Sequence, residues 1–319
     1  MAVTSAVSVP VLAVGLCGSD IQRRRAGHAV TSLGHEIVGR RPSDGALVAV
    51  RPLCPCRTCA ACRRGWTEQC PNDRSIGRYD DGLGAFSGTV HVQPDQLYEV
   101  PGHLPVPVAT LADPLACILH ALREIPVADT SVLVIGDGPM AALGAIRTRQ
   151  AGAKHVTVAV KSPDRISRLA DLGDSTVTVG DVLSNRYDVV LESAGGVSSE
   201  PISVAARAVA PLGHVVALGV YAQQTTAAIL VRALLEKESA LRGSKAYRTG
   251  NDRDDFAAAL ALLAAKPGDY EPIISSTPRW SPDDERQPVI DRGNALKIVY
   301  LADWRALRHP HFTRKQPHA

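Results

Sequence analysis

The chain has 319 residues, of which 45% are hydrophobic and 21% charged, which is ordinary for a globular protein long enough to form two domains. Its net charge of +3 is too small to indicate a nucleic-acid partner. We see no apolar run close to the roughly 18 residues of a membrane span and no signal-peptide pattern at the start. We therefore expect a cytoplasmic protein without nucleic-acid or membrane partners.

The first 120 residues combine short apolar runs with many glycines, prolines and cysteines and show little helical periodicity. This pattern predicts a β-rich, loop-rich region. Six of the seven cysteines fall within the first 70 residues. An α/β pattern follows this cluster, so a small disulfide framework is disfavoured and metal binding is indicated.

Four of these cysteines follow the spacing C-x2-C-x2-C-x7-C, namely Cys56, Cys59, Cys62 and Cys70. Short turns at this spacing can bring four thiolates onto one tetrahedral Zn²⁺ and close its coordination sphere. The alternative, four unrelated buried cysteines, does not account for the regular spacing. The sequence therefore predicts a structural zinc lobe over about residues 54–71, in which Cys54 has no assigned role.

From about Ser131, strand-like runs alternate with alanine-rich helical stretches. The predicted strands are 132–135, 155–160, 187–191 and 214–220, and the predicted helices are 140–150, 163–172 and 197–209. This alternation indicates βαβ units and a parallel sheet. A further helix is predicted over 252–265, then a proline-rich stretch over 267–288, a strand over 295–300 and an untethered tail of fifteen residues.

The first predicted strand of this α/β region runs into a G-x-G-x-x-A turn that opens a helix. Gly136 permits the tight turn, and Gly138 lets the backbone approach a pyrophosphate at the helix N-terminus, where Pro139 and Met140 follow. A glycine motif alone is weak, but its place after an apolar strand and before a helix makes it specific. We therefore predict a dinucleotide site here.

The end of the second predicted strand indicates which dinucleotide binds. NAD enzymes place an acidic residue there for the ribose 2′-hydroxyl, whereas this chain has Val160. Lys161, Ser162 and Arg165 could instead hold the 2′-phosphate of NADP. They could also be a solvated turn at the start of a helix. On balance the sequence favours NADP over NAD.

Several motifs occur together in one order along the chain. They are Gly-Leu-Cys-Gly-Ser-Asp at 15–20, Gly-His-Glu at 34–36, Asp-Gly-Leu-Gly-Ala-Phe at 81–86, Ala-Asp-Pro-Leu-Ala at 112–116, His-Ala at 120–121 and the glycine turn. With the cysteine spacing, they make the chain resemble the zinc-containing medium-chain dehydrogenase/reductase family over nearly its whole length. The resemblance implies an α/β fold with a GroES-like catalytic domain over 1–120 and 252–319, a Rossmann domain over 121–251, and a homodimer or homotetramer.

The resemblance also implies a second, catalytic zinc. Cys17 and His35 match the family's first two ligands, and Asp113 stands where the family often has a glutamate, one methylene longer. Glu36 is an alternate ligand, because family members show this position approaching the metal. An open fourth position on such a zinc would take the substrate.

By the same resemblance, Asp20 accepts a hydrogen bond from the second ring nitrogen of His35 and so orients it. Ser19 matches the hydroxyl that takes the proton from a zinc-bound alcohol. Many relatives continue the proton relay with a histidine five residues after the cysteine ligand, where this chain has Gln22. The implied mechanism passes through a zinc alkoxide that gives hydride to nicotinamide.

The motifs are most similar to those of polyol, sugar and aminocyclitol dehydrogenases, so we expect a small-molecule substrate with a secondary hydroxyl, or the reverse carbonyl reduction. Relatives usually have some twenty more residues before the motif around Cys17, and we interpret the catalytic domain as N-terminally shortened. Two alternatives stay open. One is a reductase of a C=O, C=N or C=C bond, and the other is a non-catalytic cofactor-binding protein that keeps only the structural zinc.

Overall fold

The computed structural model describes residues 6–78, 82–228, 231–250, 253–282 and 288–303. Five segments discussed above lie partly or wholly outside these ranges. They are the start of the chain, the 81–86 motif at its first position, the start of the 252–265 helix, part of the proline-rich stretch and the C-terminal tail. No helix in the described ranges is long and apolar enough to cross a membrane.

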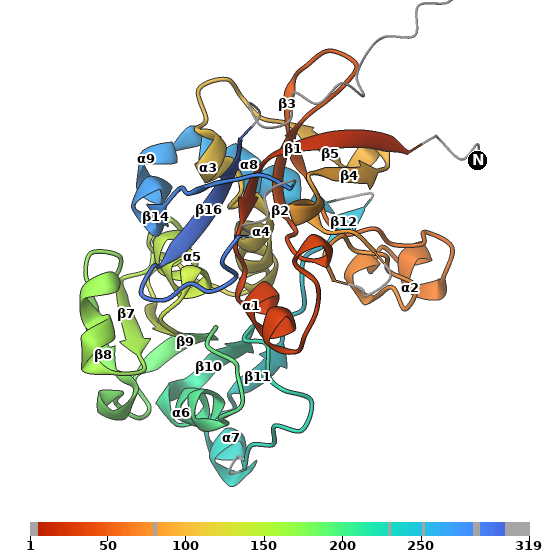
Figure 1. The fold of residues 1–319 in the computed structure, drawn as a ribbon. Coiled ribbons are helices and arrows are strands. Elements are labelled where there is room, and N and C mark those ends of the chain that lie inside the picture. The colour runs from red at the N-terminus through yellow and green to blue at the C-terminus, as the bar shows by residue number, and fades with distance from the viewer. Residues whose placement is uncertain (1–5, 79–81, 229–230, 251–252, 283–287, 304–319) are drawn as a thin grey trace, which may run out of the picture.

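One sheet has eight strands and joins the two ends of the chain. Its path runs β14-β16-β1-β2-β3-β5, with β4 paired to β1 and β15 paired to β16. The strands are β1 (Val7–Gly15), β2 (Glu36–Arg40), β3 (Leu47–Val50), β4 (Thr89–Val92), β5 (Leu97–Glu99), β14 (Ile274–Ser276), β15 (Arg279–Trp280) and β16 (Lys297–Ala302). β1 pairs antiparallel with both β2 and β16, so the red strand β1 and the blue strand β16 lie side by side in Figure 1.

The second sheet has six strands in the order β11-β10-β9-β6-β7-β8, and all its ladders are parallel. The strands are β6 (Ser131–Ile135), β7 (His155–Val160), β8 (Ser175–Thr178), β9 (Tyr187–Glu192), β10 (Val209–Ala217) and β11 (Ala240–Gly243). Numbered within this sheet, the order is 3-2-1-4-5-6, that of a Rossmann fold. The predicted parallel sheet is confirmed.

Helices surround and join these sheets, and a short hairpin of β12 (Thr249–Gly250) and β13 (Arg253–Asp254) follows the parallel sheet. The α-helices are α1 (Gly18–Arg25), α2 (Ala60–Arg63), α3 (Val106–Ala109), α4 (Ala112–Ala121), α5 (Pro139–Gln150), α6 (Glu200–Ala208), α7 (Val231–Lys237), α8 (Asp255–Ala265) and α9 (Pro267–Tyr270). Figure 1 shows α4 and α5 between the two sheets. The largest core cluster includes buried residues of both sheets and of α4, α5 and α8, so the two sheets share one core.

Two local expectations were wrong. The segment 163–172, predicted as a helix, forms only a 3-10 helix over Pro163–Arg168. The apolar residues of the segment, Ile166, Leu169 and Leu172, are three positions apart, the period of a 3-10 helix. The sequence also missed the helix α4, which begins at Ala112 and ends at Ala121. Pro114 argues against a helix in the sequence, but a proline in the first turn costs no intrahelical hydrogen bond.

Candidate metal and cofactor sites

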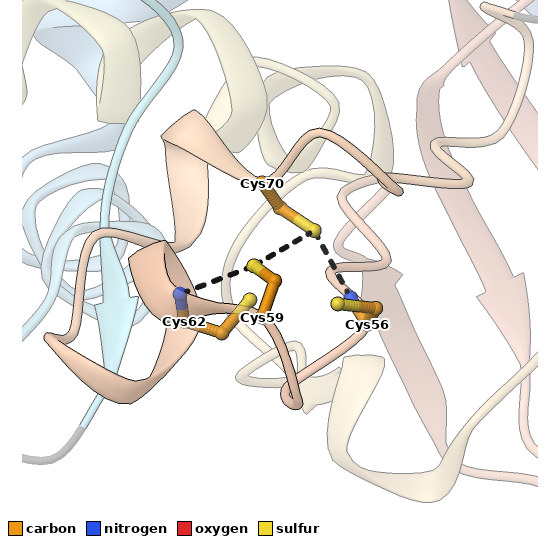
Figure 2. A group of neighbouring side chains, drawn as sticks. All are labelled: Cys56, Cys59, Cys62 and Cys70. Atoms are coloured by element: carbon orange, nitrogen blue, oxygen red, sulfur yellow. Dashed lines mark hydrogen bonds between the residues drawn. The ribbon is translucent and has the colours of Figure 1, made fainter.

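The four cysteines of the predicted lobe converge on one point. Their sulfur atoms all lie within 4.8 Å of one another, and Figure 2 shows them pointing toward a common centre. The Sγ atoms of Cys59 and Cys70 are 3.9 Å apart, whereas a tetrahedron with Zn–S bonds of about 2.3 Å has S–S edges of roughly 3.8 Å. All seven cysteines are free thiols. The donor set therefore fits a structural zinc.

The protonation of these thiols also reflects the crowding of four sulfurs. Hydrogen bonds from Thr58 and from nearby backbone amides lower the pKa of Cys56 to about 5. Burial and the neighbouring sulfur of Cys59 raise the pKa of Cys62 to about 12. A divalent cation at the centre would favour the thiolate form of all four, because thiolate is the form that binds metal.

A second group forms where β1 and β2 meet. Gly15, the last residue of β1, pairs with Glu36, the first residue of β2. This register places Cys17, just after β1, beside His35, just before β2. One ligand atom each from Cys17, His35 and Glu36 lies within 4.8 Å of the other two. A thiolate, an imidazole and a carboxylate are the types of ligand that Zn²⁺ takes in catalytic sites.

Asp20, in the first turn of α1, holds this group together. Its two carboxylate oxygens accept hydrogen bonds from the backbone amides of Gly34 and Cys17, both at 3.0 Å. His35 Nδ1 lies 3.4 Å from Asp20 Oδ1. Burial tends to raise the pKa of Asp20, but the charge of His35 and these amide hydrogen bonds outweigh it and lower the pKa. Asp20 therefore stays a carboxylate that can orient the imidazole.

Glu36 has a cationic partner on the last strand of the same sheet. Lys297 Nζ donates to Glu36 Oε2 and also to the carbonyl oxygen of Leu16 at 3.1 Å. Both charged side chains are at most 2% exposed. A Cβ atom at Gly15 would lie 2.1 Å from Glu36 Oε2, so only glycine leaves room for this carboxylate. Burial raises the pKa of Glu36, and Lys297 opposes that rise.

Asp113 has a different partner. It lies in the first turn of α4, is 5% exposed, and its Oδ1 accepts a hydrogen bond of 2.7 Å from the hydroxyl of Tyr247. Among the described residues, the group drawn together at the β1–β2 junction comprises Cys17, His35 and Glu36. The negative charge of Asp113 nevertheless contributes to the raised pKa of Glu36, which places the two carboxylates in one electrostatic environment.

The predicted proton acceptor, Ser19, lies in α1 two residues after Cys17 and is partly exposed. Gln22 lies one turn further along the same helix and is exposed. Ser19 therefore follows Cys17 closely along the chain, whereas Gln22 is exposed. Asp20, between them in sequence, is completely buried.

The glycine turn follows β6, where the strand order of the parallel sheet reverses. β6 is flanked by β7 on one side and β9 on the other, and such a switch point is where dinucleotides bind in this architecture. Gly136 has φ +145°, and a Cβ there would lie 2.8 Å from Ser193 Oγ. Gly138 is the N-cap of α5, which begins at Pro139 and continues through Met140. The Arg292 guanidinium lies against Gly138, 3.0 Å from where a Cβ would be.

The residues predicted to select NADP follow β7. Lys161 is exposed, and the Ser162 hydroxyl donates to Asp164 at 2.5 Å. Arg165 pairs with Asp164 at 3.3 Å and with Asp137 at 3.5 Å. Asp137 belongs to the glycine turn, so the structure brings Arg165 to the edge of the predicted dinucleotide site.

Comparison with known proteins gives a consistent picture. The sequence model of the alcohol dehydrogenase GroES-like domain matches residues 4–102. D-altritol 5-dehydrogenase from Agrobacterium fabrum is 32% identical over 227 residues, or 64% of this chain and 65% of that enzyme. Sorbitol dehydrogenase from Halalkalibacterium halodurans is 23% identical over 92% of this chain and 90% of its own length.

Among solved structures, a protein described as a zinc-binding dehydrogenase from Sinorhizobium meliloti, determined with NADP bound, matches with a TM-score of 0.81. It is 27% identical and covers 93% of this chain and 92% of that one. The chain is thus similar to the GroES-like domain of alcohol dehydrogenases over residues 4–102 and to zinc-type dehydrogenases over a longer stretch. The predicted fold class, a Rossmann sheet with a GroES-like domain, is thereby confirmed.

Sequence reasoning missed two residues at the candidate sites. Lys297 is a charged residue that opens an otherwise apolar strand, Lys-Ile-Val-Tyr-Leu-Ala, and a buried charge needs a partner. That pattern could have drawn attention to it. Tyr247 follows Ala246 in a loop, and we find no local sequence signal that would have singled it out.

Proposed function

We propose that this chain is a zinc-dependent, NAD(P)-linked dehydrogenase that oxidises a secondary hydroxyl of a polyol- or sugar-like substrate, or reduces the corresponding carbonyl. The observation that carries the proposal is the junction of β1 and β2, where Cys17, His35 and Glu36 meet. The names of the relatives point the same way, because D-altritol, sorbitol and L-threonine all carry hydroxyl groups.

Cys17, His35 and Asp113 would hold the catalytic zinc, with Glu36 as the alternate carboxylate. A zinc ion bound there supplies Lewis acidity, which lowers the pKa of an alcohol or polarises a carbonyl. Asp20 would keep His35 in one orientation, and the 3.4 Å between His35 Nδ1 and Asp20 Oδ1 supports this role. Ser19, two residues after Cys17, would take the proton that the alcohol releases.

The nicotinamide cofactor would bind across the switch point of the parallel sheet. Its pyrophosphate would lie against Gly136 and Gly138 at the N-terminus of α5, where backbone amides and the helix dipole favour negative charge. Lys161 and Arg165 would hold the 2′-phosphate, which makes NADP the preferred cofactor. Support comes from the ion pair of Arg165 with Asp137 of the glycine turn and from the relative determined with NADP.

Cys56, Cys59, Cys62 and Cys70 would hold a second, structural zinc. Four thiolates leave no open coordination position, so this ion takes no part in the reaction. Such a site suits a reducing compartment, and we place the protein in the cytoplasm on that ground.

We propose the same division of the chain as the sequence suggests, with a catalytic domain over 1–120 and 252–319 and a cofactor domain over 121–251. The membership of each strand in one sheet or the other supports it. We further propose a homodimer or homotetramer, as the family resemblance implies. Light scattering on the purified protein would measure the assembly directly, and a monomer at micromolar concentration would refute this part.

Elemental analysis combined with a substrate panel tests the proposed function. We expect two zinc ions per chain, one per chain in Cys17→Ala, and reduction of NADP with at least one member of a polyol and sugar-alcohol panel. Cys54→Ala is the matched control, because Cys54 is a partly buried thiol that belongs to neither ligand group, and it should keep two zinc ions. One zinc per chain in the wild type, together with tight cofactor binding and no hydride transfer, would refute the proposal.

A further inference from the structure

The segment 247–249 connects the two candidate zinc sites. At one end Tyr247 is completely buried, and its hydroxyl donates to Asp113 Oδ1 at 2.7 Å. Its ring packs against Phe256 of α8, with centroids 5.9 Å apart. The phenol therefore has little freedom, and neither does the carboxylate oxygen that it holds.

At the other end the segment is bound to the cysteine lobe. Arg248 Nη2 donates to Glu68 Oε1 at 2.7 Å, and Glu68 is only 7% exposed. The Thr67 hydroxyl donates to the carbonyl oxygen of Thr249 at 3.0 Å and lies 3.2 Å from the amide of Thr249. Thr67 and Glu68 stand in the short loop between the third and fourth cysteines of the lobe, so zinc binding there would fix their positions.

We propose that Tyr247 is a positioning residue for the catalytic zinc, holding Asp113 in the orientation that binds the ion, and that the cysteine lobe holds Tyr247 in place. The inference rests on the proposed function, because it needs Asp113 as a zinc ligand. An aspartate has a shorter reach than the glutamate usual in the family, so its orientation matters more. A hydrogen bond to one carboxylate oxygen fixes the side chain and leaves the other oxygen for the metal.

The chain offers a matched comparison in Tyr98. Its hydroxyl also donates to a carboxylate, Asp254 Oδ2 at 2.5 Å, and its ring also packs against Phe256, with centroids 4.8 Å apart. Asp254, however, caps helix α8 and belongs to neither candidate metal site. The two tyrosines thus have the same bonding chemistry but differ in whether the carboxylate that they hold is a proposed zinc ligand.

The experiment measures zinc affinity at the catalytic site of the full chain by competition with a chromophoric chelator. We expect Tyr247→Phe to lower the zinc affinity of that site about 10- to 100-fold, the usual effect of removing the hydrogen-bond partner of a metal ligand. Tyr98→Phe should stay within about twofold of the wild type, which would show that a lost phenol hydrogen bond alone has no such effect. The zinc of the four-cysteine site should be retained in both variants and serves as the internal reference.

Cobalt substitution adds a readout that general destabilisation would not move. With Co²⁺ in place of zinc, the visible absorption reports the ligands and geometry of the metal. We expect Tyr247→Phe to change the cobalt bands of the catalytic site and Tyr98→Phe to leave them unchanged. Unchanged bands and unchanged affinity in Tyr247→Phe would overturn the inference.

The contribution of the lobe is tested with Thr67→Val. This change keeps the shape of the side chain and all four cysteines, but removes the hydroxyl that bonds Thr249. We expect it to lower the zinc affinity of the catalytic site, as Tyr247→Phe does, while the structural zinc stays bound. Unaltered affinity at the catalytic site would refute the link to the lobe.

Asp113→Asn separates failure of this inference from failure of the proposed function. If Asp113→Asn weakens zinc binding at the catalytic site and Tyr247→Phe does not, the proposed role of Tyr247 is refuted and the proposed ligand set stands. If Asp113→Asn binds zinc as tightly as the wild type, Asp113 is no ligand, and both the ligand set and the inference fall.

Discussion

Asp255, the first residue of α8, offers a sharp test of how the molecule holds its buried charges. The side chain is 1% exposed. It accepts hydrogen bonds from the amide of Arg248 at 3.0 Å and from Arg253 Nε at 2.6 Å, and it lies 3.1 Å from His120 and 3.2 Å from Arg123. One carboxylate thus compensates several cationic groups and fixes the segment that contains Tyr247.

Asp255→Asn keeps the shape of this side chain and removes its charge. Breaking a buried ion pair by removing one partner costs about 3–5 kcal/mol. Arg253 is 40% exposed and Arg123 15% exposed, so water can partly solvate the two guanidinium groups that lose their anionic partner. We therefore expect a loss at the lower end, about 3 kcal/mol, measured as the difference in unfolding free energy from urea titrations at constant free zinc.

Asp254→Asn is the control one residue earlier. Asp254 Oδ1 caps α8 by accepting from the amides of Phe256 and Ala257, and asparagine caps helices about as well as aspartate. We expect a smaller loss than in Asp255→Asn, about 1 kcal/mol, because the amide still caps the helix but pairs less strongly with the Tyr98 hydroxyl that donates to Oδ2. Equal losses in the two variants would show that charge compensation at Asp255 contributes nothing beyond helix capping, which would refute the reasoning.

The same carboxylate makes a prediction about pH. Burial tends to raise the pKa of Asp255, but hydrogen bonds from His120, Arg248 and Arg253 lower it well below its usual range. Because the folded pKa lies below the unfolded value of about 3.9, the stabilisation is fully present above that value. It is lost as the pH falls toward the folded pKa. The difference in unfolding free energy between the wild type and Asp255→Asn should therefore become smaller below about pH 4.

Three further outcomes are expected. Lys297→Met should lower the unfolding free energy, measured with urea, by about 3–5 kcal/mol, because it leaves Glu36 buried without a partner. Adding Glu36→Gln should restore much of this free energy, and no recovery in the double variant would contradict the ion pair. Cys59→Ser should lower zinc from two ions to one per chain by elemental analysis, while Cys54→Ser keeps two. Lys161→Ala should weaken NADP binding about tenfold or more in fluorescence titrations and leave NAD unaffected, and equal effects on both cofactors would count against a 2′-phosphate contact.

The features that the sequence predicted well depend on contacts within a short stretch of chain. The four-cysteine lobe spans fifteen residues, from Cys56 to Cys70, and its spacing alone brings the sulfurs together. The central strands of the parallel sheet are buried on both faces and read as continuous apolar runs, as in β7, which matches its predicted bounds. The two edge strands, β8 and β11, were missed because an edge strand is less covered and its sequence is more polar.

The partners of the site residues could not be predicted in this way. Tyr247 and Asp113 are 134 positions apart in sequence, and Lys297 and Glu36 are 261 positions apart. Such pairs arise from how β16 returns to β1 and how the 247–249 segment packs, which no local pattern encodes. The family resemblance supplied Cys17, His35 and Asp20 because a motif fixes their place, but it carried no information about residues that other family members need not share.

The return of β16 to the side of β1 has a consequence for synthesis. The parallel sheet, from β6 to β11, can be complete once residue 243 has left the ribosome. The larger sheet can be complete only after residue 302, the end of β16, has also left it. Until then Glu36 has no ammonium partner and β1 has an open edge, which is a template for aberrant pairing. Nascent chains halted between these two points should resist protease in the cofactor half and be cut in the other.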